Sequence, residues 1–249
     1  MEEVSKYIYG IIAADGEMSL KQTGIEEGSQ VYTINSKDMA AVVSDTSFIV
    51  CDPTRKNMMS HNQVLEALMN DYTILPARFG LLCDSEEKLR GLMDEYYSTL
   101  KDCLRKLENR MEVGVKVFWR KEKMLTIFMR RSPRLARLQR EIQQAIPVKV
   151  HGLLAEAGEL VKQQVEEWQE EYGDQMYMRL MKVAIDGKRN YPVDISNILN
   201  ASFLVDISRE KVFDAAIEEL DAKHGDWAIF KCVKPVPPYN FVNLEMYLK

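Results

Sequence analysis

Apolar runs in the first part of the chain predict short β-strands separated by polar segments. The run 7–13 is dense in β-branched and aromatic side chains and ends near Asp15-Gly16, which is a turn signal. Two further runs, 31–34 and 40–44, have the same character. The polar stretch that holds Gly24 and Gly28 is typical of a surface loop. We therefore expect three strands before the first helix.

The next segment predicts a helix, a strand and a longer helix. Ser60-His61-Asn62-Gln63 has the pattern of a capping box, in which serine and glutamine side chains satisfy free backbone amides, so the first helix should begin at Ser60. Residues 73–80 are expected to form a strand, which Pro76 restricts to an edge or a bulge. Asp84 is expected to cap a helix whose apolar residues recur every three or four positions as far as Leu107.

A second unit is predicted to start near Met111 with a strand over residues 113–119. Ser132-Pro133 supplies the cap and the first-turn proline of a helix start. Pro147 and Gly152 then indicate a break or kink before a further helix that extends as far as Tyr172.

The rest of this unit is predicted to alternate strands with one more helix. Residues 175–185 and 198–207 read as strands around a turn at 186–190, and a helix over 212–220 precedes a last strand over 227–233. The order strand, helices, strand, strand, helix, strand is that of a ferredoxin-like fold whose first helix is elaborated into a pair.

The end of the chain is rich in proline. Because proline cannot donate to a β-ladder, the chain is expected to leave the last strand at Pro235 and to continue through Pro237 and Pro238 as an extended tail. Tyr239 and Phe241 supply apolar anchors. A tail this apolar is expected to pack across the body of the protein and help join its domains, with docking on another chain as the alternative.

These elements predict an α+β protein of two mixed domains. The expected boundaries are residues 1–110 for the first domain, residues 111–233 for a ferredoxin-like βαββαβ sandwich, and residues 234–249 for the tail. We see no internal repeat and no low-complexity tract.

Composition narrows the class of protein. Apolar residues make up 46% of the 249 residues and charged residues 29%, as in a globular protein with real cores. The net charge of −5 disfavours a nucleic-acid partner. No apolar run approaches the roughly 20 residues of a membrane helix, and the acidic start is unlike a secretion signal. We therefore expect a cytoplasmic location and no membrane partner.

The four cysteines are too far apart for a C-x-x-C pair, which argues against zinc-ribbon and thioredoxin-type sites. Their mostly apolar neighbours indicate small buried hydrophobes in a reducing compartment. Three histidines without metal-ligand spacing, and the lack of phosphate-loop and nucleophile-elbow patterns, leave no catalytic, cofactor-binding or metal-ligating residue to assign. No cofactor is expected.

His61 and Arg78 are the two polar residues that invite a functional interpretation. His61 is expected in the first turn of a helix, where the positive end of the helix dipole disfavours the imidazolium. It would then be a neutral base or a residue that hydrogen-bonds locally. Arg78 interrupts the apolar run 74–82, so it needs a carboxylate partner if buried or else contacts a partner protein.

A basic stretch precedes an acidic one in the second unit. Residues 116–140 hold nine basic side chains and one acid, Glu122, whereas the following helix is rich in glutamate. The two helices are expected to neutralise each other within one fold, while an acidic partner or RNA is the alternative. Aromatic residues do not interleave with the basic ones as single-strand binders require.

Seven short segments carry a family signal through their order and spacing: residues 7–11, 40–44, 61–65, 75–80, 115–119, 200–205 and 237–241. Together they resemble the gas vesicle F/L family (GvpF/GvpL) over nearly the whole chain. The resemblance implies a non-enzymatic accessory or minor structural protein of gas vesicles. Its expected partners are the major gas vesicle shell protein and other gas vesicle accessory proteins.

Candidate structural or partner-contact residues can then be named, without a catalytic role. They are His61, Arg78, Phe79, Pro237, Pro238, Tyr239 and Phe241. Two alternatives are a small-molecule enzyme on a ferredoxin-like fold that uses His61 and Arg78, and an RNA-binding module that uses the basic stretch.

Overall fold

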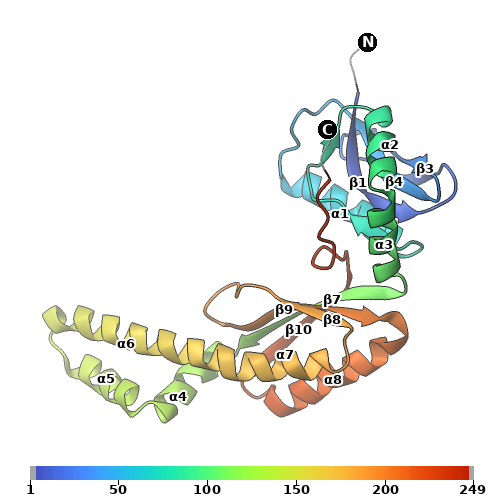
Figure 1. Cartoon of the computed structure of the whole chain (residues 1–249). Coiled ribbons are helices and arrows are strands. Elements are labelled where there is room, and N and C mark those ends of the chain that lie inside the picture. Colours follow the sequence, from blue (N-terminus) through green and yellow to red (C-terminus); the bar gives the residue numbers. More distant parts are fainter. Residues whose placement is uncertain (1–3, 247–249) are drawn as a thin grey trace. The chain divides into compact units, whose positions relative to one another are not determined.

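A separate β-sheet forms within each of two parts of the chain in the computed structural model, which describes residues 4–246 (Figure 1). Unit 1 comprises the described residues up to Glu112 together with those from Pro235 onward, and unit 2 is Val113–Lys234. Helices accompany both sheets, so the α+β class predicted from the sequence is confirmed.

The sheet of unit 1 has the strand order β2-β3-β4-β1-β5, and β6 also pairs with β1. Its strands are β1 (Ser5–Ala13), β2 (Ser19–Thr23), β3 (Gln30–Ser36), β4 (Met39–Thr46), β5 (Ile74–Pro76) and β6 (Leu82–Cys83). Strand β2 lies in the segment predicted to be a loop. That prediction was wrong because polar residues are tolerated on an edge strand that faces solvent.

A bulge in β1 shapes the core of unit 1. The pairing of β1 with β4 shifts between Ile8 and Gly10, so Tyr7, Tyr9 and Ile12 share one buried cluster despite their uneven spacing. Gly10 itself pairs with Pro76, and a Cβ at this position would lie 2.6 Å from the Leu75 carbonyl oxygen. Only glycine therefore permits this close approach of β5.

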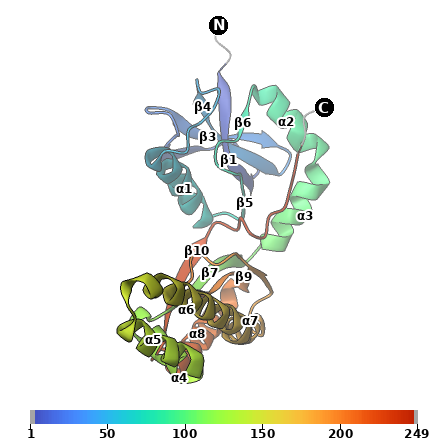
Figure 2. The same cartoon turned by 90° about the vertical axis from the view of Figure 1, so that its left-hand side faces the viewer.

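Helices cover both faces of this sheet (Figure 2). They are α1 (Arg55–Met69) on one face and α2 (Glu86–Glu95) with α3 (Tyr97–Leu107) on the other. Helix α1 begins five residues before the predicted Ser60, because the Thr54 hydroxyl accepts from the Asn57 amide. Helix α2 is capped by Ser85, not Asp84, since the Ser85 hydroxyl accepts from the Lys88 amide.

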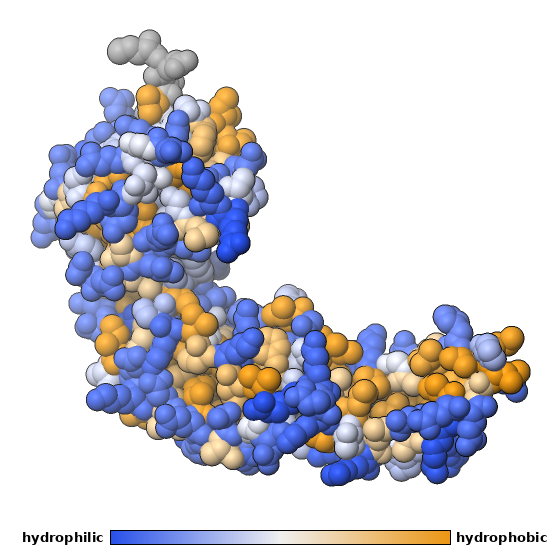
Figure 3. All heavy atoms as spheres, turned by 180° about the vertical axis from the view of Figure 1, so that it is seen from behind, coloured by the Kyte–Doolittle hydropathy of each residue, from blue (hydrophilic) through white to orange (hydrophobic). Residues whose placement is uncertain are grey.

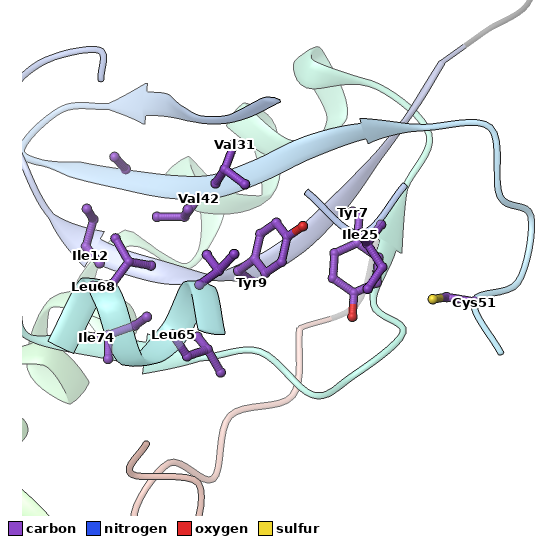
Figure 4. Packing of buried hydrophobic residues seen from close by; sticks show 12 residues of the cluster. Tyr7, Tyr9, Ile12, Ile25, Val31, Val42, Cys51, Leu65, Leu68 and Ile74 are labelled. Carbon is purple, nitrogen blue, oxygen red and sulfur yellow. The ribbon is translucent and has the colours of Figure 1, made fainter. Parts of the chain in front are cut away.

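The buried cluster between α1 and the sheet is built from both elements (Figure 4). Leu65 and Leu68 of α1 face Tyr9 and Ile12 of β1, and all four are essentially inaccessible to solvent. Burial of this many large side chains supplies the main free energy that holds α1 on the sheet.

Unit 2 contains the sheet β10-β7-β9-β8. The strands are β7 (Arg110–Trp119), β8 (Asp186–Arg189), β9 (Asn197–Asp206) and β10 (Ala228–Val236), with β7 and β10 reaching across the unit boundary. The helices are α4 (Lys121–Arg131), α5 (Pro133–Gln144), α6 (Pro147–Trp168), α7 (Asp174–Met181) and α8 (Glu210–His224), and a π-helical turn at Gln169–Gly173 joins α6 to α7.

Two local predictions for unit 2 were wrong. Residues 175–185 were expected to be a strand, but α7 covers most of them, with Met176 and Leu180 buried at helical spacing. The expected turn at 186–190 is instead strand β8, which pairs antiparallel with β9. The short apolar run fits either period, and the contacts of α7 with α8 and β9 decide for the helix.

The helix boundaries in unit 2 agree only in part with those predicted from the sequence. Ser132 caps α5 by accepting from the Leu135 amide, as predicted. Pro147 begins α6, but Gly152 lies inside this helix and causes no break. Residues 121–131 form α4, which the sequence pattern did not indicate.

Strand β10 continues through Pro235 to Val236, so the prediction that the chain leaves the sheet at Pro235 was wrong. Because β10 is an edge strand, a proline there needs no partner for its missing N–H. Cys51 and Cys83 are buried as expected, whereas Cys232 on β10 is exposed. All four cysteines are free.

Aromatic residues fill the centre of unit 2. Trp119 of β7 lies 4.5 Å from Trp168 and 4.9 Å from Trp227, measured between ring centroids, and Phe128 of α4 packs edge-on against Trp119. Trp119 is 2% exposed. This cluster attaches α4 and the end of α6 to the sheet.

Candidate functional site: the tail-docking site around His61

His61 lies in the interior of α1, buried against strand β1. Its Nδ1 is 2.9 Å from the Tyr7 hydroxyl oxygen. The expectations of a first-turn position and of local hydrogen bonding were wrong, because α1 starts at Arg55 and Tyr7 is 54 positions away.

A chain of hydrogen bonds runs from the Gly80 amide through Tyr7 and the His61 ring to Tyr239. The Gly80 amide donates to the Tyr7 hydroxyl oxygen at 3.1 Å, so the Tyr7 hydroxyl hydrogen is available for His61 Nδ1. His61 Nε2 lies 2.9 Å from the Tyr239 hydroxyl oxygen, and in the tautomer in which Nδ1 accepts from Tyr7 it carries the ring proton and donates to Tyr239. Both ring nitrogens are thus engaged within unit 1.

Burial controls the ionisation of this network. Desolvation lowers the pKa of His61 to about 4, although a hydrogen bond with the Ala77 backbone acts in the opposite direction. Burial likewise raises the pKa of Tyr239 to about 12 and the pKa of Tyr7 above its ordinary value. At neutral pH all three groups are therefore uncharged, and the cause is desolvation instead of the helix dipole.

Aromatic rings surround His61. Tyr9 stacks on it with centroids 5.6 Å apart, and Phe79 meets it edge-on at 5.7 Å. The Tyr9 hydroxyl lies 3.1 Å from Ser44 Oγ. The structure thus brings together three of the residues singled out from the sequence, His61, Phe79 and Tyr239. Tyr7 and Tyr9, which the sequence did not single out as site residues, join them.

The C-terminal tail enters this site through two turns. The Tyr239 amide donates to the Pro237 carbonyl at 2.7 Å, and the Phe241 amide donates to the Pro238 carbonyl at 3.1 Å. Pro238 is buried, while Pro237 and Phe241 are half-buried. The segment is therefore folded back on itself here and is not an extended polyproline helix.

Glu112 provides a second anchor for the tail. Its carboxylate accepts from the Asn240 backbone amide at 3.1 Å and from the Asn240 side-chain amide at 2.6 Å. Glu112 is only 2% exposed. Sequence reasoning missed it, although a carboxylate between Met111 and Val113 in an apolar strand indicates a buried charge that needs donors.

Arg78 lies outside this network. It follows β5 in an exposed turn and forms no ion pair within residues 4–246. The prediction of a strand residue held by a buried carboxylate was wrong, because β5 ends at Pro76 and the backbone turns before the guanidinium could point inward. Its main-chain carbonyl accepts from the Leu81 amide.

A groove of about 760 Å³ lies elsewhere on unit 1, between the edge strand β2 and helix α1. Its lining includes Thr23, Ile25, Arg55, Met59 and Gln63. Met59 is 50% exposed, and its neighbour Met58 is 46% exposed. The groove therefore offers a flexible thioether surface beside the unpaired backbone edge of β2.

Side chains that could bind a metal ion do not cluster in the described part of the chain. Within residues 4–246 no group of three His, Cys, Asp or Glu side chains is placed to hold a metal ion. No helix in the same range is long and apolar enough to cross a membrane.

Comparison with known proteins gives a consistent result. The model of the family described as gas vesicle synthesis protein GvpL/GvpF matches residues 5–243. Gas vesicle protein F of Streptomyces sp. (strain CB03234) is 30% identical over 245 residues, which cover 96% of this chain and all of that relative. Gas vesicle protein F1 of Halobacterium salinarum is 27% identical over 243 residues, covering 96% and 93% of the two chains.

A solved structure agrees with these relatives. The crystal structure of GvpF from Anabaena sp. PCC7120 superposes with a TM-score of 0.79 at 25% identity, covering 97% of this chain and 99% of that one. The resemblance stated from the sequence is therefore confirmed over almost the full length.

Proposed function

The chain belongs to the gas vesicle synthesis protein GvpL/GvpF family, which gives it a gas vesicle-related role, and on this premise we propose that it binds the major shell protein during assembly. The proposal includes contacts with other vesicle proteins and a cytoplasmic site of action. It describes a non-enzymatic accessory or minor structural protein. The observation that carries it is the family match over residues 5–243.

The surface of unit 1 supports a binding role. An amphipathic shell subunit would aggregate unless its apolar side were covered before insertion, and a soluble partner needs an apolar surface to do so. The groove beside β2 supplies Met59 and the apolar part of its lining, and the β2 edge supplies backbone groups for an added strand. We propose this groove as the contact for the shell protein.

The enzyme alternative finds less support. Tyr7 and Tyr239 occupy both ring nitrogens of His61, and Arg78 is exposed with no role in that network. A general base must reach its substrate's proton directly or through one water. Saturable turnover of a metabolite that is lost in a folded His61→Asn variant would support the enzyme instead.

We also propose that units 1 and 2 are the domains of this protein and that unit 2 is ferredoxin-like. The strand order β10-β7-β9-β8 supports the second assignment, since it places the first strand of the unit between its last and third strands.

Co-expression with the shell protein tests the function. We expect the full chain to keep the shell protein in the supernatant and to co-purify with it. A Met59→Glu variant should lose this capture, because a carboxylate in the groove opposes burial of an apolar partner. Met178→Glu is the matched control, since Met178 on α7 is 59% exposed and lies in unit 2. Equal capture by both variants would exclude the groove, and no capture by the intact chain would refute the function itself.

A further inference from the structure

One segment of unit 2 carries a charge opposite to that of the whole protein. We call residues 121–155 the basic hairpin: it contains α4, α5 and the first turns of α6. Eight of its side chains are basic and two are acidic, whereas the full chain has a net charge of −5. The segment thus concentrates positive charge on a protein that is otherwise acidic.

Internal ion pairs neutralise only part of this charge. Arg134 pairs with Glu156 at 2.6 Å, and Arg131 lies 3.8 Å from Glu171 and stacks over Trp168. The expectation that the basic and acidic helices neutralise each other is therefore correct for these two arginines. Six exposed basic side chains of the hairpin form no ion pair within residues 4–246: Lys121, Lys123, Arg130, Arg137, Arg140 and Lys149.

Apolar side chains are exposed at the same end of unit 2. Ile146, between α5 and α6, is 61% exposed; Val148 and Leu154 of α6 are 88% and 52% exposed. Figure 3 shows hydrophobic residues gathered near the outer end of the helical hairpin, with hydrophilic residues beside them. Water contact with these side chains is unfavourable, and a partner that covered them would gain their burial.

The α6 backbone is also open on this side. A Cβ added at Gly152 or at Gly158 would meet no atom within 4 Å, and Ala155 between them is exposed. Glycine weakens a helix interior, yet no neighbour within the described chain requires it at either position. Small residues without an internal neighbour permit a second helix to approach closely.

The ion pair between Arg134 and Glu156 shows how α5 and α6 are aligned. Because Arg134 meets Glu156, the antiparallel packing of α5 on α6 places Arg137 and Arg140 level with the first turns of α6. Cationic side chains therefore lie level with the turns that carry Val148 and Leu154.

We propose that the outer end of the basic hairpin binds an acidic amphipathic helix of a partner protein. The exposed aliphatic residues would meet its apolar stripe, and Arg137, Arg140 and Lys149 would meet its flanking carboxylates. Exposed aliphatic side chains add nothing to the binding of a phosphate backbone, and the exposed residues of 121–155 include no Phe, Tyr or Trp for stacking on bases. A bilayer would not require the glycine-lined helix surface. This proposal is independent of the groove on unit 1.

Binding of two labelled probe peptides to the full chain tests this proposal. One is a helical leucine–glutamate peptide and the other its leucine–lysine counterpart, both followed by fluorescence anisotropy. We expect only the glutamate peptide to bind, with an affinity that falls as salt is added. Arg137→Glu/Arg140→Glu and Val148→Gln/Leu154→Gln should each weaken binding about tenfold or more.

Control variants show whether a loss of binding comes from the surface of the basic hairpin or from a general change in charge, hydrophobicity or folding. Arg137→Lys/Arg140→Lys should retain most of the binding. Ile207→Gln/Val212→Gln, which changes two exposed apolar side chains elsewhere in unit 2, should have no effect. Gly152→Gln/Gly158→Gln should keep the helix content, shown by circular dichroism, and lose binding.

Four results would overturn the proposal. These are no binding of the glutamate peptide, equal binding of both peptides, stronger hairpin-dependent binding to anionic phosphatidylglycerol vesicles or single-stranded RNA, and hairpin-dependent self-association in sedimentation experiments.

Discussion

Burial decides the chemistry of single residues in unit 1, and His61 is the clearest case. Its ring is 1% exposed and hydrogen-bonds two phenols, so its ordinary pKa of 6.5 is lowered to about 4 by desolvation. The folded protein therefore holds a neutral imidazole across the whole physiological range. Its two ring nitrogens connect β1 to the tail through hydrogen bonds with Tyr7 and Tyr239.

The lowered pKa predicts a pH-dependent stability. The unfolded chain takes up a proton near pH 6.5 but the folded chain only near pH 4, so the contribution of neutral His61 is complete above 6.5 and is lost as the pH falls to 4. The loss is expected to total roughly 3 kcal/mol. Urea unfolding at a series of pH values measures it.

A variant of His61 tests whether this residue causes the loss of stability between pH 6.5 and 4. His61→Phe should be less stable at pH 7 but should show a flatter profile between pH 6.5 and 4. His224, whose pKa burial also lowers, contributes with the same sign, so His224→Phe is the parallel control. Asp38, whose pKa is lowered to about 2 mainly by its hydrogen bond with Lys101, acts only at lower pH. A profile unchanged by His61→Phe would contradict the assignment.

Arg78 is exposed, so we expect its replacement to have little effect on stability. Arg78→Met should change the free energy of unfolding by less than about 0.5 kcal/mol, because an exposed side chain without an ion pair is removed. Thermal unfolding checks this, and shell-protein capture by the same variant tests a direct contact. A large loss of stability would restore the structural role that its sequence context suggested.

Among the elements, the tail depends most on contacts with residues distant in sequence. Its turns place Tyr239 at His61 and Asn240 at Glu112, 178 and 128 positions away. These four side chains form two polar anchors in an otherwise apolar surrounding, and an unpaired buried donor or carboxylate there would be costly.

Removing one hydroxyl tests the first anchor. Tyr239→Phe should destabilise the protein by about 1–2 kcal/mol, because the buried His61 Nε2 loses its hydrogen-bond partner while the Tyr239 ring is kept. Truncation before Pro237 should cost more, since it removes Asn240 and the buried surface of Pro238 and Phe241 as well. Melting temperatures test whether the tail is docked on unit 1. If the tail were free, both variants would melt like the intact protein.

In the whole molecule, unit 1 is assembled from both ends of the chain whereas unit 2 is continuous. A fragment of residues 110–236 retains all of β7 and β10, the complete sheet and the aromatic cluster around Trp119. We expect it to fold cooperatively, with dispersed amide signals and a single thermal transition.

A fragment of residues 1–112 is expected to behave differently, because it lacks the tail. Residues 1–112 alone lack Tyr239 and Asn240, so they should be less stable than unit 1 in the intact chain. Adding a synthetic peptide of residues 235–246 should raise their melting temperature. A stable fragment 1–112 that ignores the peptide would show that the tail is dispensable for unit 1.

The sequence by itself determined the α+β class, the family, and those elements whose signals are local. The apolar runs at β1 and β4 and the serine–proline start of α5 fix backbone conformation through neighbours only, so a pattern along the chain reveals them. His61, Phe79 and Tyr239 could be singled out for the same reason, each by its place in a short motif.

Tertiary structure decided the rest, because the deciding contacts join residues far apart in the chain. Packing against α8 and β9 made residues 174–181 a helix where a short apolar run permitted either state. The edge position of β10 allowed a strand to pass through Pro235. Burial against Tyr7 and Tyr239 set the charge of His61, and the early end of β5 left Arg78 in solvent. The burial of a side chain and the pairing of a strand depend on which segments lie together in space, and a local sequence pattern does not determine this.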